Sequence, residues 1–269
     1  MQKILFSLFL AASVPAFGQV PQTKSETVEA RYCPKPSEDE NCSKVEITRL
    51  IFDNPAHTAF SDRLLRDNVS DLELPDFEQG RLQRELEKAV NETKDENGYL
   101  RLEYHAENIL FGYSPDYLTI KNVMWVYGGG PHGNGGDYFS TIPRQGKPAA
   151  LKTEDILLPG KTAAFVAAVK EGLAEYYMEA GEAKNRQEAF DALPSSFDQD
   201  YKNADFNWTP DKGGLYFVFN PYSLGSYLAT ADFTLPADKL RGIVKPEFLK
   251  QLELFEKTAK DLKLNPCRS

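Results

Sequence analysis

The amino-acid sequence predicts an α+β fold, with amphipathic helices packed on one face of an antiparallel sheet. Segments in which apolar and polar residues alternate indicate half-buried strands, and apolar residues at helical spacing indicate helices. The two kinds of segment do not alternate strictly, as they do in parallel β-α-β folds. With 41% hydrophobic and 12% aromatic residues, the chain can bury a sizeable core. We expect the other face of the sheet to be solvated or to offer a binding surface.

Residues 1–18 have the features of a secretory signal peptide. Lys3 supplies the positive charge, Ile4–Ala12 forms the apolar segment, and Ala16 and Gly18 are small residues at the cleavage site. The apolar segment is shorter than the roughly 20 residues that a membrane-spanning helix needs. We therefore expect an exported protein, periplasmic or secreted, with no membrane span.

Residues 19–43 are polar and lack helical or strand periodicity, which predicts an extended leader. Cys33 and Cys42 enclose a loop rich in proline and acidic residues, and an oxidising compartment makes their disulfide the default expectation. Cys267 is then left over: it is free, pairs between chains, or displaces one cysteine of this pair. Because no CxxC spacing or histidine cluster accompanies the cysteines, we expect no metal site.

The part of the chain from the leader to residue 143 predicts strands interrupted by two helices. From Tyr99 onward the period is two, and the face that carries Leu102, Tyr104, Ala106 and Leu100 is expected to be buried. The predicted elements are a strand at Lys44–Phe52, helices within His57–Val69 and Asp76–Lys94, a strand from Tyr99, and strands at Tyr117–Tyr127 and Gly136–Pro143.

The remainder of the chain combines helices with three short strands. A long helix is predicted because Val166, Val169, Leu173 and Tyr177 fall on one face. The predicted elements are a short helix from Thr153, a helix at Thr162–Ala180, a polar loop with a helical turn at Ala183–Tyr201, strands at Ala204–Trp208, Leu215–Phe219 and Leu228–Phe233, and a final helix at Pro246–Leu262.

The formal net charge is -9, and it becomes -10 when residues 1–18, which contain Lys3 and no acid, are removed. This balance argues against a nucleic-acid partner, because phosphates attract basic groups. It favours a basic partner through long-range attraction. Simple solubility is the alternative explanation of the charge.

Several motifs together resemble a known extracytoplasmic family. The strand pattern LTI..V..Y leads into the loop YGGGPHGN at Tyr127–Asn134, and a GK...L.D.L pattern follows at Gly146, Lys147, Leu151, Asp155 and Leu157. The closing segments match best, at Phe206–Asp211, Gly214–Tyr227 and Phe233–Leu240. From about Lys44 to Leu240, the chain resembles the domain shared by the lysozyme-sensing anti-sigma factor of Gram-positive bacteria and the N-terminal region of a peptidoglycan deacetylase.

This resemblance implies two subdomains packed as one unit. Residues 44–134 correspond to the deacetylase-like N-terminal subdomain, and residues 135–269 to the lysozyme-sensor-like subdomain. It also implies an antiparallel sheet with packed helices, binding of a lysozyme in one relative, and no catalytic residues in this domain. The chain departs from the pattern by an extra Gly-Pro in the loop and by Ser226 in place of a proline, and both departures concern the ligand more than the fold.

The glycine-rich loop at Gly128–Asp137 is a candidate binding site. Its residues Gly129, Gly130, His132 and Asn134 can present backbone N–H groups to an anion or another ligand. The loop lacks the Lys-Ser/Thr ending of a phosphate-binding loop, so a nucleotide site is disfavoured. The favoured alternative is a tightly packed connection whose glycines serve the backbone. For His132 we favour a structural role, bonded to the loop backbone, over a role as ligand or catalytic base.

Aromatic residues gather at Tyr216–Tyr227. Tyr222 and Tyr227 are candidates for recognition of a sugar or protein, because tyrosine is enriched at binding hot spots. Ordinary strand packing is the alternative, since alternation places about half of these side chains in the core.

The leading hypothesis is a non-catalytic, exported binding module of the cell envelope, whose partner is a lysozyme or another basic cell-wall-related protein, or peptidoglycan. The alternatives are an enzyme that acts on envelope polysaccharide, with the His132 loop at its site, and a structural envelope protein. No cofactor is expected.

Overall fold

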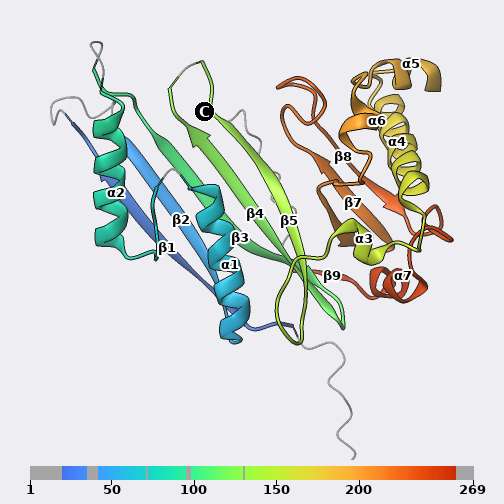
Figure 1. The fold of residues 1–269 in the computed structure, drawn as a ribbon, viewed down its shortest axis with the longest axis horizontal. Coiled ribbons are helices and arrows are strands. Elements are labelled where there is room, and N and C mark those ends of the chain that lie inside the picture. Colours follow the sequence, from blue (N-terminus) through green and yellow to red (C-terminus); the bar gives the residue numbers. More distant parts are fainter. Residues whose placement is uncertain (1–19, 35–41, 71, 95–97, 130, 259–269) are drawn as a thin grey trace, which may run out of the picture.

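The computed structural model describes residues 20–34, 42–70, 72–94, 98–129 and 131–258. Within these ranges the chain forms two sheets and seven helices, which confirms the α+β class (Figure 1). The predicted signal peptide and Cys267 lie outside the described residues. Among the described helices, none combines the length and the apolar character that crossing a membrane requires.

The first sheet contains six strands, five of them in the order β1-β2-β3-β4-β5 (Figure 1). The prediction of an entirely antiparallel sheet is wrong at one pair, because β2 and β3 run parallel. Two helices intervene between these strands, and a crossover of that length allows the chain to return in the same direction. The strands are β1 (Thr23–Tyr32), β2 (Ser43–Phe52), β3 (Glu103–Tyr113), β4 (Tyr117–Tyr127), β5 (Asn134–Pro143) and the short β9 (Glu256–Lys257), which pairs with the end of β3.

Residues 19–43 were predicted to be an extended leader without regular structure. This prediction is wrong for Thr23–Tyr32, which form the strand β1. β1 pairs with β2 along its whole length, from Thr23 opposite Phe52 to Tyr32 opposite Ser43. Its side chains are mostly exposed, and only Val28 and Ala30 are buried, so the alternation is weak in the sequence. The predicted disulfide between Cys33 and Cys42 is present and joins the two strands just beyond their last pair.

Helices α1 (Pro55–Asn68) and α2 (Gln79–Glu92) cover one face of the first sheet, as predicted (Figure 1). The Asn54 side chain accepts a hydrogen bond from the Ala56 N–H at the start of α1. The predicted stripe on α2 is buried, with Leu82, Leu86 and Val90 fully covered. Leu100 was predicted to lie on the buried face of the next strand, but it precedes β3 and is 45% exposed.

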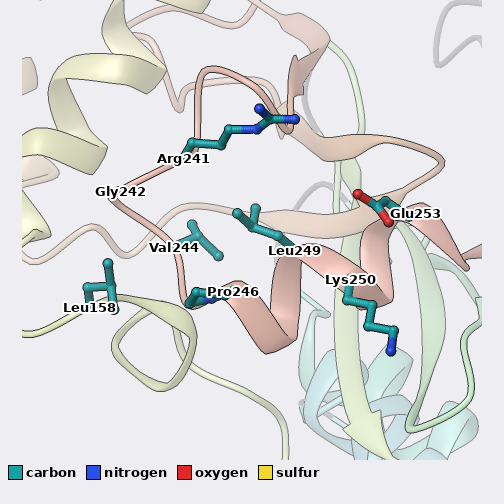
Figure 2. A pocket seen from close by; sticks show the side chains of 8 residues that line it. All are labelled: Leu158, Arg241, Gly242, Val244, Pro246, Leu249, Lys250 and Glu253. Atoms are coloured by element: carbon teal, nitrogen blue, oxygen red, sulfur yellow. The ribbon is translucent and has the colours of Figure 1, made fainter.

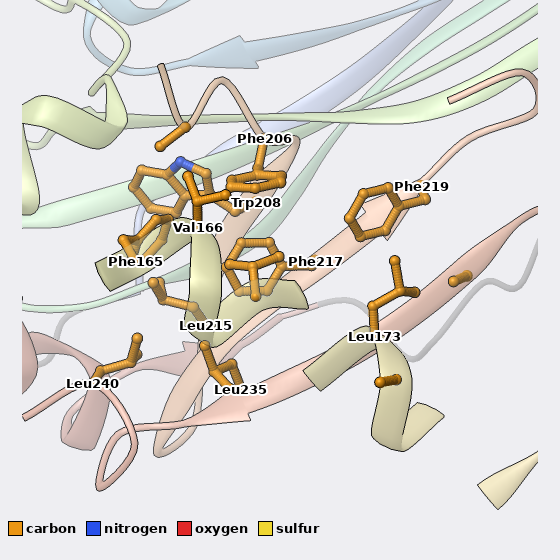
Figure 3. Close-up of a cluster of buried hydrophobic side chains, with 14 of the residues drawn as sticks. Phe165, Val166, Leu173, Phe206, Trp208, Leu215, Phe217, Phe219, Leu235 and Leu240 are labelled. Atoms are coloured by element: carbon orange, nitrogen blue, oxygen red, sulfur yellow. The ribbon is translucent and has the colours of Figure 1, made fainter. Parts of the chain in front are cut away.

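The second sheet is antiparallel and lies beside β5 (Figure 1). Its core is rich in aromatic side chains, which pack between the sheet and the long helix; Phe165, Phe206, Phe217 and Phe219 are among them (Figure 3). The elements of this part are α3 (Thr153–Ile156), α4 (Thr162–Glu179), α5 (Arg186–Asp191), α6 (Phe197–Asp200), β6 (Trp208–Asp211), β7 (Gly214–Phe219), β8 (Ala231–Pro236) and α7 (Pro246–Glu253).

Two strand predictions in this part are displaced. The strand expected at Ala204–Trp208 begins only at Trp208, because Ala204 adopts a positive φ of 58° at the end of a turn. The strand expected at Leu228–Phe233 begins at Ala231 and continues to Pro236, while Leu228 is 84% exposed.

Two helix predictions also need correction. The segment expected to be a loop with one helical turn contains two short helices, α5 and α6, and Asn185 caps α5 through a bond from the Glu188 N–H. The final helix ends at Glu253 instead of Leu262, because Phe255 turns into the core beside Phe111 and the next residues pair with β3. Leu262 lies outside the described residues.

The expected division into residues 44–134 and 135–269 stays a prediction. In the structure Asn134 is the first residue of β5, so this boundary lies between β4 and β5. The second sheet meets the outer edge of β5 through two asparagines. The Asn220 side chain accepts from the Asp137 N–H (3.0 Å) and donates to the Asp137 carbonyl (2.8 Å), and the Asn207 side chain accepts from the Phe139 N–H (3.0 Å). These amides satisfy backbone groups that an edge strand otherwise exposes.

Candidate binding surface

The glycines of the β4–β5 loop make room for neighbouring side chains. Gly129 has a positive φ of 89° and lies against Leu100, whereas Gly130 lies outside the described residues. A Cβ atom on Gly133 would stand 2.5 Å from the indole ring of Trp125, and one on Gly136 would stand 2.5 Å from the Asn220 amide. Larger residues at these two positions would displace their neighbours. The contacts support the interpretation that the loop is a tightly packed connection.

His132 projects from this loop into solvent. Its Nδ1 atom lies 2.9 Å from the Gly133 carbonyl oxygen, and because a carbonyl only accepts, Nδ1 carries the proton in this contact. The imidazole stacks on the Tyr227 ring, with centroids 4.1 Å apart and planes 27° apart. The backbone bond is the one that the sequence led us to expect, but the side chain is exposed rather than buried beneath the loop.

Tyr222 is held in a costly backbone conformation. Its φ is 69°, in the left-handed region that bulky residues rarely adopt. The turn is closed by bonds from the Tyr222 N–H to the Ser226 carbonyl and from the Gly225 N–H to the Tyr222 carbonyl. The ring is 52% exposed and lies 5.6 Å from the Tyr227 ring. Backbone strain of this kind concentrates at binding sites.

Three of the six predicted site residues therefore meet in one group: His132, Tyr222 and Tyr227, which we call the loop cluster. His132 comes from the β4–β5 loop, and the two tyrosines come from the loop between β7 and β8. Asn134 is exposed at the start of β5, and Gly129 lies against Leu100. Leu228, next to Tyr227 in the chain, adds an exposed apolar side chain.

Two aromatic residues that the sequence reasoning did not single out lie next to the loop cluster. Trp125 and Tyr127 are on β4, are half-exposed, and have ring centroids 6.3 Å apart with planes 12° apart. Both project from the face of the first sheet opposite α1 and α2, because Leu118 and Ile120 face the helices and side chains alternate along a strand. In the sequence this face is marked only by the polar residues Thr119 and Lys121, because residues 123–127 are apolar on both faces.

A partly buried ion pair lies on the same face of the sheet. The Lys121 ammonium is 2.6 Å from an Asp137 carboxylate oxygen. Burial raises the pKa of Asp137 above its ordinary value, and the bond with Lys121 offsets this only in part. The pair lies next to the asparagines that join β5 to the second sheet, and the Asp137 side chain is 26% exposed.

A shallow hollow of about 530 Å³ lies elsewhere, beside α7 (Figure 2). Leu158, Val244 and Leu249 line it, with Arg241 and Glu253 at its rim. None of the predicted site residues contributes to it. Within the described ranges, no three His, Cys, Asp or Glu side chains are grouped closely enough to hold a metal ion.

Comparison with known proteins finds one family model that matches part of the chain, and its description names no activity. The model of a family described as "Protein of unknown function (DUF3298)" matches residues 154–238, which contain α4 and the second sheet. Among curated proteins, none matches the chain. The relationship to the lysozyme-sensing anti-sigma factor and the deacetylase remains a prediction from the sequence motifs.

Two crystal structures of proteins from this family are similar to the chain. One is from Pseudomonas aeruginosa PAO1, with a TM-score of 0.59 and 20% identity over 85% of this chain and 96% of that chain. The other is from Bacteroides fragilis NCTC 9343, with a TM-score of 0.60 and 13% identity over 87% of this chain and 98% of that chain. At these identities, the similarity concerns the fold alone.

Proposed function

We propose that this chain is an exported, non-catalytic binding module of the cell envelope, and that the loop cluster is its recognition surface. The observation that carries the proposal is the convergence of His132, Tyr222 and Tyr227 from two loops into one exposed aromatic group. Tyrosines that combine a solvent-exposed hydroxyl with an apolar ring are typical of binding hot spots.

The strain at Tyr222 supports the same conclusion. A bulky residue at positive φ costs of order 1–3 kcal/mol, and glycine is the residue that removes this cost. The Tyr222 ring packs little against the rest of the protein, because it is 52% exposed. A tyrosine kept in such a place is better explained by recognition than by stability.

The partner classes are those suggested by compartment, charge and resemblance: a lysozyme or another basic cell-wall-related protein, or peptidoglycan. A net charge of -9 favours approach of a basic protein at low salt. The enzyme alternative has less support. His132 is bonded to a backbone carbonyl and stacked on a ring, and within the described part of the chain no carboxylate contacts it.

The test uses the full mature chain. Lysozyme is titrated into it by calorimetry at low and moderate salt, and co-sedimentation with purified peptidoglycan is measured in parallel. We expect binding in at least one of the two assays. If lysozyme is the partner, higher salt should weaken its binding. Absence of binding in both assays would contradict it. Turnover of peptidoglycan that His132→Ala abolishes would favour the enzyme instead.

A further inference from the structure

The loop cluster lies beside two aromatic side chains of the first sheet. His132 stacks on Tyr227 on one side, and on the other side its backbone neighbour Gly133 lies directly against the indole of Trp125. The indole is followed by the nearly parallel ring of Tyr127. The rings of Tyr222, Tyr227 and His132 and the rings of Trp125 and Tyr127 are thus two neighbouring sets joined through Gly133, which together we call the aromatic strip.

Every ring of the strip reaches solvent. Tyr222 is 52% exposed, His132 is exposed, and the other three are half-exposed. Glycines keep the strip accessible along β5: Gly135 is the residue directly opposite Trp125, and Gly133 leaves room for the indole ring. A side chain at position 135 would project beside the indole on the same face, whereas Gly133 packs against one part of the ring.

Hydrogen-bonding side chains border the strip. In the register of β3 and β4, His105 stands opposite Trp125 and Glu103 stands opposite Tyr127, so all four project from the same face. The Glu103 side chain is 13% exposed and is paired with Arg101. Glu46, on β2, lies 3.3 Å from His105 Nδ1, and its side chain is 45% exposed. The rings therefore have carboxylate and imidazole groups beside them that accept and donate hydrogen bonds.

We propose that the aromatic strip binds a linear polysaccharide of pyranose units, an inference that rests on the proposed binding function. Each sugar has an apolar C–H face that can stack on a ring and hydroxyl groups that can bond to flanking carboxylates. Several neighbouring rings with polar side chains beside them fit such a chain. A protein partner instead favours anchors gathered at the centre of a patch from which water is excluded.

Tryptophan fluorescence provides a direct test, because the chain has two tryptophans in different settings. Trp125 is half-exposed in the strip, whereas Trp208 is 6% exposed in the second core. We expect the hexasaccharides of N-acetylglucosamine and of cellulose, titrated to millimolar concentration, to include at least one that shifts the emission of Trp125 to shorter wavelength. Trp125→Phe should lose the shift but still bind in calorimetry, because it keeps an aromatic ring.

Variants then locate the site. Tyr227→Ala should weaken hexasaccharide binding about tenfold or more, the loss of one stacking contact. Tyr138→Ala is the matched control: Tyr138 is a 42% exposed tyrosine on β5 that stands opposite Asn122, on the other face of the sheet. It should bind as the unaltered chain does.

The outcomes separate this inference from the proposed function. Absence of both heat and emission shift with both hexasaccharides overturns the inference, and so does binding that Tyr227→Ala leaves unchanged. If lysozyme binds while the hexasaccharides do not, the binding module stands and the polysaccharide is wrong. If no partner binds in either set of assays, both proposals fail.

Discussion

Two groups of aromatic side chains lie within a few residues of each other and differ in their surroundings. Phe217 and Phe219, on β7, are 0% and 3% exposed in the second core (Figure 3), whereas Tyr222, just beyond the strand, is 52% exposed at positive φ. The first group stabilises the fold, because burying an aromatic ring removes a large apolar area from water. The exposed Tyr222 ring contributes little to the stability of the fold, and we assign it to recognition. Burial and backbone strain distinguish the two groups, although residue type does not.

The largest expected effect is a loss of stability when a buried aromatic ring of the second core is removed. Phe217→Ala should lower the free energy of unfolding by about 3–5 kcal/mol, because it leaves a cavity between β7 and α4. Urea unfolding followed by circular dichroism measures the change. Tyr138→Ala, at an exposed position, should stay within about 0.5 kcal/mol of the unaltered chain. A small loss for Phe217→Ala would show that the second core is not packed as described.

The next largest expected effect is a loss of stability when the connection between the two sheets is weakened. Asn220→Ala should cost about 1–3 kcal/mol, because it removes two bonds to the backbone of Asp137 and leaves the Asp137 N–H without its partner, although Asn207 still donates to the Asp137 carbonyl. Asn203→Ala, at an exposed asparagine, is the control and should be neutral. The same unfolding experiment measures both. Equal stability of the two variants would contradict the role assigned to Asn220.

A smaller effect depends on pH. His57, on α1, is 4% exposed, and burial lowers its pKa below the ordinary value. As pH falls below about 6.5, the unfolded chain takes up a proton that the folded chain resists. The free energy of unfolding should therefore fall with acidification, by at most about 1.4 kcal/mol per pH unit from this residue. Urea unfolding between neutral pH and mild acid checks this, and the slope should be shallower in His57→Gln than in the unaltered chain. An identical slope would contradict the assignment to His57.

The smallest effect addresses the strain at Tyr222. Tyr222→Gly should be about 1 kcal/mol more stable than Tyr222→Ala, because only glycine adopts a φ of 69° freely. This reverses the usual order, in which glycine destabilises. Both variants should bind the partner more weakly than the unaltered chain. If Tyr222→Ala were the more stable of the two, the backbone would not be strained there.

Local patterns predicted much of the fold. The stripe of Leu82, Leu86 and Val90 identified α2 because a helix buried on one side needs apolar residues at helical spacing. The parallel pairing of β2 with β3 could not be predicted in this way, since it depends on contacts between distant segments. Likewise, the alternation that suggested a strand from Ala204 could not reveal the positive φ of that residue.

The candidate site was predicted in pieces. His132 and Tyr227 were each singled out by residue type and local motif, but their stacking joins two loops that are far apart in the sequence. Trp125 was missed because its neighbours on β4 are apolar on both faces for part of the strand, which obscures the open side. Gly133 and Gly136 were not singled out, because the side chains that need the space, Trp125 and Asn220, come close to them only in the fold.

The most direct test of the central claim compares two variants in the same lysozyme and peptidoglycan assays. A double variant, Tyr222→Gly with Tyr227→Ala, removes both tyrosines of the loop cluster, and Tyr138→Ala removes one exposed tyrosine from the opposite face of β5. We predict that the double variant remains folded and loses at least about tenfold in affinity, while Tyr138→Ala binds normally. Equal binding by a folded double variant and by Tyr138→Ala would contradict the claim that these loops form the recognition surface.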